Sequence, residues 1–173
     1  MKKKLQIGLI GSYSDLPIDK YKKIAREIGK EIAKSNCIFV GGVEKNGGLV
    51  LESAKSCRRN GGIVVSICRN KDDATSSDII IPTFGVPGLR EYFLPLACDS
   101  IIAINGGSGT LNEISVAYQN NIPIIILGDT GGWSQKLQGT YLDDRKKYKF
   151  ETAKTPKEAV RVSIIEAKKR LLN

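Results

Sequence analysis

Short runs of apolar residues alternate along the chain with segments in which apolar residues recur at helical spacing. The run at 5–10 is followed by a pattern in which Ile24, Ile28 and Ile32 fall on one face of a predicted helix. The same alternation continues to the end of the chain. It predicts further strands at 37–40, 63–67, 79–81, 101–104 and 124–127, and helices from Pro17 to about 34 and at about 49–59, 89–97 and 110–118. A last helix is predicted from Pro156 onward, with an apolar stripe that reaches Leu171.

Continuous apolar strands separated by amphipathic helices are typical of a parallel sheet that is covered on both faces. We therefore expect an α/β fold: a Rossmann-like, doubly wound, mainly parallel sheet of about six or seven strands flanked by helices. The 173 residues suit a single nucleotide-binding domain, 1–173. The least regular stretch, 128–149, is expected to be a surface loop or lid, and Pro95 is expected to kink or shorten its helix.

A glycine-rich turn joins the strand at 101–104 to the helix after it. The first N–H groups of a helix have no partner within the helix and carry the positive end of its dipole, so this turn is expected to bind an anion, most simply a phosphate. Thr110 is expected to begin the helix. The candidate phosphate-binding residues are Gly106, Gly107, Ser108, Gly109 and Thr110.

Two earlier strands also end in small residues, Gly11-Ser12 and Gly41-Gly42. Ligands of doubly wound sheets bind beyond the carboxyl ends of the strands, where these turns should meet the first one. The turn at 106–110 lacks the lysine of a P-loop and does not fit G-x-G-x-x-G, which argues against a nucleoside triphosphatase and an ordinary nicotinamide dehydrogenase. A plain tight connection between strand and helix is the alternative to a phosphate site.

Two charged residues near these turns are candidates for chemistry. Glu113 can close a capping box with Thr110, or it can be a carboxylate of the first helical turn, kept ionised by the dipole and able to stabilise a developing cation or activate water. Arg90 can be an ordinary surface arginine. As a permanently charged, bidentate donor it can equally hold a phosphate or orient Glu113. We take Arg90 and Glu113 as the candidate catalytic pair.

Composition narrows the chemistry. The chain has no histidine, so Ser-His-Asp and Cys-His schemes are excluded, and its four widely spaced cysteines favour buried, reduced thiols over disulfides or a zinc site. We expect no metal and no cofactor. The formal charge of +9 attracts anions, but the basic residues are spread over the chain, so we do not expect a dedicated nucleic-acid partner. No apolar run is long enough for a membrane helix, and a cytoplasmic location is expected.

The stretch LREYFLPLACDSIIAINGGSGTLNEISVAY resembles the signature of the LOG proteins, phosphoribohydrolases that are often labelled lysine decarboxylases. Arg90 falls on the arginine of that family, Asp99 keeps the matching separation, and the glycines, Thr110 and Glu113 fall on its P-G-G-x-G-T-x-x-E motif. The segments around 40–49 and 61–62 are similar to its second glycine motif, and IGLIGSYSD resembles its first strand and the turn that contacts the nucleobase. The likeness spans roughly residues 5 to 127.

This chain departs from the LOG pattern at several positions. Glu91 replaces a lysine, Leu94 a methionine and Asn105 a proline, and the loop between Gly42 and Gly47 is longer than in plant-type members. The sequence is therefore closer to a divergent prokaryotic branch, which is similar to molybdenum-cofactor carrier proteins as much as to cytokinin-activating enzymes.

The resemblance implies hydrolysis of the N-glycosidic bond of a nucleoside 5′-monophosphate to free base and ribose 5-phosphate. In that scheme the glycine turn holds the phosphate, Glu113 lies beside the ribose, Arg90 assists departure of the base, and Gly11 and Ser12 line the base pocket. It also implies a homo-oligomer, with the helix around Arg90 near the interface. The alternative is a carrier that binds a phosphorylated ligand of pterin or nucleotide type without turnover. A third hypothesis, single-stranded DNA binding as in DNA-processing protein A, rests on positive charge alone.

Overall fold

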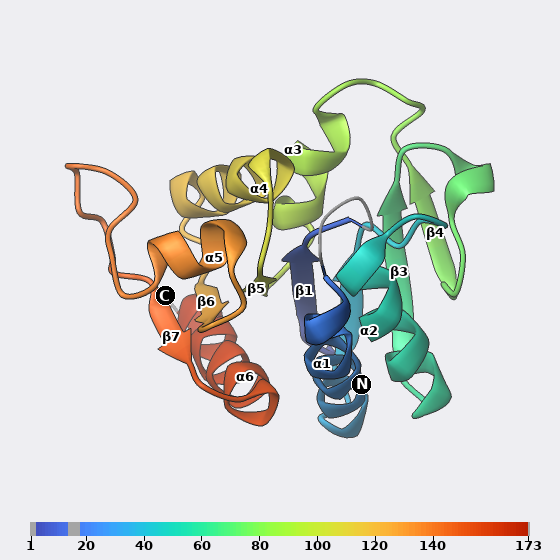
Figure 1. Cartoon of the computed structure of the whole chain (residues 1–173), viewed down its shortest axis with the longest axis horizontal. Helices are drawn as coiled ribbons and strands as arrows, with labels where there is room; N and C mark the ends of the chain where they lie inside the picture. The colour runs from blue at the N-terminus through green and yellow to red at the C-terminus, as the bar shows by residue number, and fades with distance from the viewer. Residues whose placement is uncertain (1–2, 14–17, 173) are drawn as a thin grey trace.

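Seven parallel strands form one sheet in the computed structural model, which describes residues 3–13 and 18–172. The strand order is β4-β3-β2-β1-β5-β6-β7 (Figure 1). The expected α/β, Rossmann-like, doubly wound sheet is confirmed. The strands are β1 (Gln6–Gly11), β2 (Ile38–Gly41), β3 (Ile63–Cys68), β4 (Ile79–Pro82), β5 (Ser100–Ile104), β6 (Ile124–Leu127) and β7 (Glu151–Ala153).

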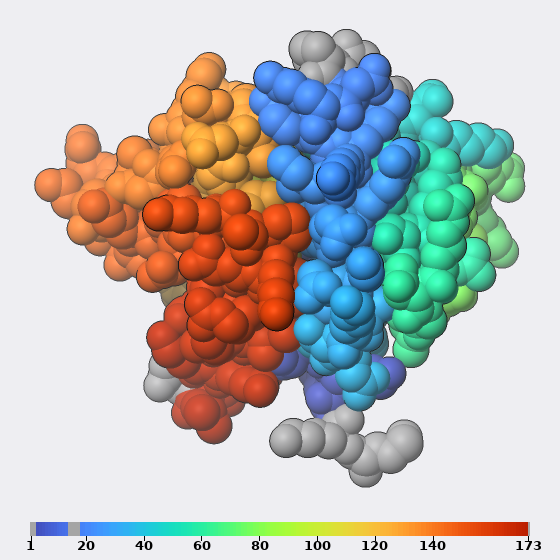
Figure 2. Space-filling model, turned by 60° about the horizontal axis from the view of Figure 1, so that its bottom comes forward, coloured from blue at the N-terminus to red at the C-terminus, as the bar shows by residue number. Residues whose placement is uncertain are grey.

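Helices cover both faces of the sheet. The α-helices are α1 (Lys22–Lys34), α2 (Gly48–Arg59), α3 (Leu89–Leu96), α4 (Ser108–Gln119), α5 (Gly132–Leu137) and α6 (Pro156–Leu172), and two single 3-10 turns are η1 (Asp19–Tyr21) and η2 (Lys71–Asp73). Helices α1, α2 and α6 pack on one face, and α3, α4 and α5 pack on the other. Figure 2 shows the first of these faces, with α1 between α2 and α6.

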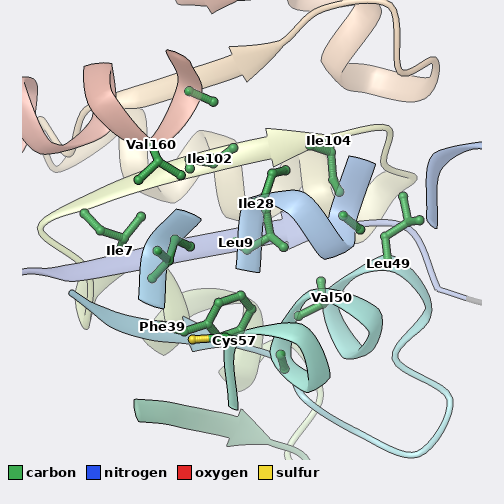
Figure 3. Close-up of a cluster of buried hydrophobic side chains, with 14 of the residues drawn as sticks. Ile7, Leu9, Ile28, Phe39, Leu49, Val50, Cys57, Ile102, Ile104 and Val160 are labelled. Atoms are coloured by element: carbon green, nitrogen blue, oxygen red, sulfur yellow. The ribbon is translucent and has the colours of Figure 1, made fainter. Parts of the chain in front are cut away.

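Alternate residues of the central strands serve the two faces. In β5, Ile102 and Ile104 belong to the core beneath α1, α2 and α6, whereas Ile101 and Ala103 belong to the core beneath α3, α4 and α5. Figure 3 shows the first core, in which Ile28 of α1 lies over β1 and β5. Both faces are apolar, which is why these strands appear in the sequence as unbroken runs rather than as alternating patterns.

The order of the strands reverses between β1 and β5. From β1 the chain builds outward through β2 and β3 to β4, and then crosses back through α3 to place β5 on the other side of β1. The turns after β1 and β5 therefore separate in opposite directions and leave a crevice between them, which is the usual ligand position in such sheets. In Figure 1, β1 points toward this edge, where α3 and α4 lie side by side.

The structure corrects three details of the sequence-based prediction. Strand β7 was not among the predicted strands. The stretch 128–149, predicted to be a loop or lid, contains helix α5, and its end is packed down through Tyr148 and Phe150, which contact the ring of Tyr118. Helix α4 begins at Ser108 with Gly107 as its N-cap, not at Thr110. The predicted start of the first helix at Pro17 lies outside the described residues.

Other local predictions hold. The last helix begins with the expected box, because Glu158 N donates to Thr155 Oγ1 (3.2 Å) and the Glu158 carboxylate accepts from Lys154 N (2.8 Å). Helix α3 ends one residue after Pro95. All four cysteines are buried free thiols. Within the described ranges, no helix combines the length and apolar character that crossing a membrane requires.

Candidate functional site

A pocket of about 790 Å³ opens at the carboxyl edge of the sheet, at the reversal between β1 and β5. Its walls come from the turns after β1, β2 and β3, from the first turns of α2 and α4, and from α3. The volume is in the range of sites for nucleotide-sized molecules. The lining residues are Leu9, Ile10, Gly11, Ser12, Tyr13, Gly42, Asn46, Val50, Arg69, Arg90, Glu91, Gly107, Ser108, Gly109, Thr110 and Glu113.

A small buried network fixes the floor of the pocket. Ser12 Oγ donates to Asn105 Oδ1 (2.6 Å), and the N–H of Gly106 donates to both oxygens (2.9 and 2.7 Å). Asn105 is in turn held by Thr130, through Thr130 Oγ1 (2.9 Å) and the Thr130 carbonyl (2.6 Å). The ends of β1, β5 and β6 are therefore joined by hydrogen bonds.

Asn105 has a left-handed backbone, with φ 54°. Proline is fixed near −65°, so the proline of the LOG motif is incompatible with this turn as it is folded here, whereas asparagine tolerates the left-handed region. The departure from the motif at this position therefore accompanies a backbone conformation that proline cannot adopt.

The N-terminus of α4 faces the pocket. The first hydrogen bond of the helix runs from Leu111 N to the Gly107 carbonyl (3.1 Å), so the N–H groups of 108–110 precede it and have no carbonyl one turn earlier within the helix. Gly107, Ser108, Gly109 and Thr110 all line the pocket. The N-terminus of α4 thus opens into the pocket at the reversal of strand order, where the sequence predicts an anion site.

Glu113 does not form a capping box. It is the sixth residue of α4, and Thr110 lies inside the helix, so the alternative in which Glu113 merely caps the helix through Thr110 is wrong. Among the described residues, no group donates a hydrogen bond to its carboxyl. Glu113 is only 7% exposed, and it lines the pocket.

The expectation that the helix dipole keeps Glu113 ionised is also wrong. Burial raises the pKa of Glu113 to about 8, against the lowering effect of Arg90, and the nearby charge of Glu91 raises it further. Position explains the difference, because Glu113 lies in the second turn of the helix and desolvation outweighs a dipole that acts mainly in the first turn. At neutral pH the carboxyl is mostly protonated.

Arg90 is buried and surrounded by acceptors. Its Nη1 donates to Tyr13 Oη and to Glu44 Oε2 (3.2 Å), and its Nη2 donates to Glu91 Oε1 (2.6 Å). Burial acts to lower the pKa of Arg90, but the electrostatic effects of Tyr13, Glu113, Glu44 and Glu91 outweigh it, so the pKa lies above its usual value. The interpretation of Arg90 as an ordinary surface arginine is therefore wrong.

Three residues of this cluster were not predicted from the sequence. Tyr13, Glu44 and Arg69 follow β1, β2 and β3 respectively, and Glu44 contacts both of the others. The one sequence signal for Glu44 was the lengthened loop between Gly42 and Gly47, in which it lies. Arg69 adds a second positive side chain to the lining of the pocket.

The remaining predicted residues divide into two groups. Gly11, Ser12 and Gly42 line the pocket. Gly41 and Gly106 do not, and they have packing roles: a Cβ on Gly41 would lie 2.7 Å from Val50, and a Cβ on Gly106 would lie 2.5 Å from Thr110. Asp99, which keeps its LOG-like separation from Arg90, lies at the opposite edge of the sheet, where its carboxylate accepts from Gln6 N (2.8 Å).

The arrangement offers anion-binding N–H groups on one wall and a buried arginine with neutral and ionised carboxyls on another. A ligand with a phosphate at one end and a polar ring at the other would match both. Among the described residues, no group of three or more histidine, cysteine, aspartate or glutamate side chains is arranged to hold a metal ion.

A sequence model of the SLOG cluster4 family matches residues 4–160, which include every element that forms the pocket. This chain belongs to the SLOG cluster4 family. An uncharacterized protein of Archaeoglobus fulgidus is 33% identical over 119 residues, which is 68% of this chain and 76% of that protein.

Solved structures extend the comparison. The X-ray structure of TM1055 has a TM-score of 0.83 at 25% identity, with 91% of this chain and 97% of that chain covered. The molybdenum cofactor binding protein of Rippkaea orientalis has a TM-score of 0.77 at 26% identity, with both chains covered completely. The expected relationship to a divergent LOG-like branch, similar to molybdenum-cofactor carriers, is confirmed. DNA-processing protein A of Helicobacter pylori, at 13% identity and a TM-score of 0.68 over 94% of this chain and 81% of its own, shares the fold alone.

Proposed function

We propose that this SLOG cluster4 protein binds a phosphorylated small molecule of nucleotide or pterin type in the pocket at the reversal of strand order. The observation that carries the proposal is the N-terminus of α4, whose N–H groups at 108–110 open into that pocket. A phosphate bound there gains both hydrogen bonds and the favourable end of the helix dipole. Arg69 adds positive charge to the same pocket.

The other end of the ligand is expected to lie between Ser12 and Arg90. These residues present a hydroxyl and a fixed guanidinium, which suit the polar edge of a heterocycle better than a second phosphate, since the charge of Arg90 is already balanced by Glu44 and Glu91. The similarity to a molybdenum cofactor binding protein supports a ligand of this kind.

Binding without turnover agrees best with the state of Glu113. A carboxyl that is mostly protonated at neutral pH is poorly suited to stabilise an oxocarbenium-like charge, and only its ionised fraction is able to act as a base for water. Glu91 also replaces the lysine of the LOG motif, next to the candidate catalytic arginine. We therefore favour a carrier or binding protein.

Hydrolysis of a nucleoside 5′-monophosphate is the second candidate, and one observation favours it. Glu113 and Arg90 both line the pocket, and a carboxyl with a raised pKa can serve as a general acid that protonates a departing base. In this scheme Glu113 gives its proton to the departing base as the N-glycosidic bond breaks and water attacks C1′ of the ribose. The proton that the water releases returns to the Glu113 carboxylate, and Arg90 stabilises the leaving group. The products are free base and ribose 5-phosphate.

The two candidates are separated by one experiment. The protein is incubated with AMP, GMP, CMP and UMP, binding is measured by calorimetry, and free base is measured by chromatography. Binding of at least one nucleotide with no release of base is the expected result. Release of base that is lost in Glu113→Gln would establish the hydrolase, and absence of binding to every nucleotide and to inorganic phosphate would contradict the proposal.

We also propose that the chain forms a homo-oligomer through the region of β4 and α3. A second copy is the expected occupant, because large apolar side chains are exposed throughout one stretch of the chain, including all three isoleucines of the edge strand β4. These side chains belong to Ile79, Ile80, Ile81, Phe84, Val86, Tyr92, Phe93 and Leu96. The buried free thiols support a reducing, cytoplasmic location.

A further inference from the structure

The carboxylate of Glu44 joins segments that follow three different strands. Its Oε2 accepts hydrogen bonds from Tyr13 Oη (2.7 Å) and from Arg90 Nη1 (3.2 Å), and its Oε1 accepts from the backbone N–H of Arg69 (2.7 Å). Glu44 is itself only 6% exposed. Its backbone is held in place by a bridge to Ala74 and by a bond from Gly47 N to the Glu44 carbonyl (2.9 Å).

These contacts decide which part of Arg90 is free. Nη1 is occupied by Tyr13 and Glu44, and Nη2 donates to Glu91. Arg90 is only 5% exposed, and its Nε is buried. Among the described residues, no group accepts a hydrogen bond from this Nε–H. Buried donors are nearly always paired, so an unpaired one in a residue that lines a pocket points to a ligand atom as its missing partner.

We propose that Glu44 is a positioning residue for this pocket. It fixes the Arg90 guanidinium, so that the unpaired Nε–H is held ready for the ligand, and it fixes the backbone of Arg69, the second arginine of the lining. The proposal rests on the proposed function, in that the ligand is taken to bind between these arginines and α4.

The role requires a carboxylate. Each oxygen of Glu44 faces donors only, one from the backbone and two from side chains. A glutamine side chain has the same shape, but only one of its two terminal groups is an acceptor, and the other is an NH₂ donor. In either orientation the NH₂ group would face at least one donor, so glutamine cannot accept from Tyr13, Arg69 and Arg90 together. Replacement of Glu44 by glutamine should therefore release the guanidinium, the loop at Arg69, or both.

The guanidinium can be observed directly by NMR of arginine side chains in the wild-type protein. The Nε–H signal of Arg90, assigned by its loss in Arg90→Lys, is expected to be resolved, with slow rotation of its Nη groups. In Glu44→Gln we expect this signal to broaden or disappear. The matched control is Glu52→Gln, because Glu52 pairs with Arg26 (2.6 Å) outside the pocket and should leave the signal unchanged.

Two outcomes would overturn the proposal: fast rotation of the guanidinium in the wild type, or an unchanged Arg90 signal in folded Glu44→Gln. If Glu44→Gln fails to fold, fast rotation in the wild type would still overturn the proposal, and slow rotation would support a fixed guanidinium. A merely structural role for Glu44 would lower the melting temperature without changing the Arg90 signal of the folded protein.

Affinity for AMP supplies the second readout. Misplacement of a binding group by about an ångström can cost up to a hundredfold, so Glu44→Gln is expected to weaken AMP binding roughly tenfold or more, and Glu52→Gln to leave it unchanged. Equal affinity in Glu44→Gln and the wild type would overturn the proposal. If the wild type binds no AMP, the proposed function fails for this ligand, while the NMR result still decides whether Glu44 holds Arg90.

Discussion

The hydroxyl of Ser12 lies 2.6 Å from Asn105 Oδ1, and this buried hydrogen bond connects the end of β1 to the end of β5 at the point where the strand order reverses. The residues at the ends of these two strands are thus directly connected. Asn105 also carries the left-handed backbone of the turn and bonds to Thr130. Asn105 therefore both joins the ends of β1, β5 and β6 and carries the turn that leads into α4.

Replacement of Asn105 by proline, the residue of the LOG motif, should destabilise the protein by roughly 3 kcal/mol or more. Proline cannot adopt φ 54°, and it removes the N–H that donates to Thr130 Oγ1. Asn105→Gly is the control: it keeps the backbone and loses only the side-chain bonds, for which we expect about 1 to 3 kcal/mol. Denaturant unfolding measures both, and a proline variant as stable as the glycine variant would contradict the backbone argument.

Glu113 should make the stability of the protein depend on pH. Its pKa is raised from 4.5 to about 8 by folding, so between these values the folded state holds a proton that the unfolded state has lost. Stability from this group is present below about 4.5 and is lost as the pH rises toward 8, at roughly 1.4 kcal/mol per pH unit.

Glu113→Gln removes this titration. Its stability relative to the wild type should therefore increase steadily between pH 4.5 and 8, as measured by urea unfolding at a series of pH values. Glu52→Gln, at an exposed pair with Arg26, should follow the wild type. A constant difference between Glu113→Gln and the wild type over this range would mean that Glu113 is ionised throughout.

Gly109→Asp separates ligand binding from helix stability. A Cβ at Gly109 meets no atom within 4 Å, so the fold can accept the side chain. A carboxylate in the first turn favours the helix by about 0.3 to 1 kcal/mol, but it repels a phosphate at the same N–H groups. We expect unchanged or higher stability together with AMP or phosphate binding weakened roughly tenfold or more.

The control for Gly109→Asp is Lys157→Asp, at the second position of α6 and outside the pocket lining. It alters the net charge by a larger amount, so unchanged binding in this variant would exclude a general effect of charge. If Gly109→Asp binds phosphate as well as the wild type, the anion does not lie at the N-terminus of α4.

Phe93→Glu should dissociate the proposed homo-oligomer. Phe93 is 49% exposed on α3, and a charge there would be buried at the interface if a second copy covers this helix. Light scattering after size-exclusion chromatography should give a dimer or larger for the wild type and a monomer for the variant. Leu172→Glu, at an 88% exposed position of α6, should leave the assembly intact, and a monomeric wild type would contradict the proposal.

Much of the sheet could be predicted because its central strands are buried on both faces, and unbroken apolar runs such as 101–104 are distinct from the glycine-rich segments that follow them. Strand β7 could not be predicted, since only Ala153 of its three residues is fully buried and the segment lacks an apolar run. Helix α5 was missed because its N-cap and its first residue are both glycines, Gly131 and Gly132, which usually indicate a loop. Here Trp133 N and Ser134 N donate to the carbonyls of Gly106 and Asn105 (both 3.0 Å), so the segment is held by the turn that it packs against.

The candidate site was predictable only where its residues are local in sequence. The glycine turn and Glu113 lie on one strand-helix unit. The error about the N-cap arose because Thr110 and Glu113 have the spacing of a capping box, whereas the extended backbone of Gly107 fills the N-cap position. Glu44 could not be found in this way. Its partners lie 25, 31 and 46 residues away, and only the folded sheet brings them together.

The walls of the pocket come from several separate segments, namely the turns after β1, β2 and β3, the first turns of α2 and α4, and α3, and most of these segments lie outside the hydrogen-bonded sheet. A change in one turn can therefore alter one side of the ligand while the strands and their apolar core are conserved. Descendants of a common ancestor could in this way acquire different ligands one turn at a time, and the lengthened, Glu44-bearing turn of this chain is the kind of change by which such divergence would proceed.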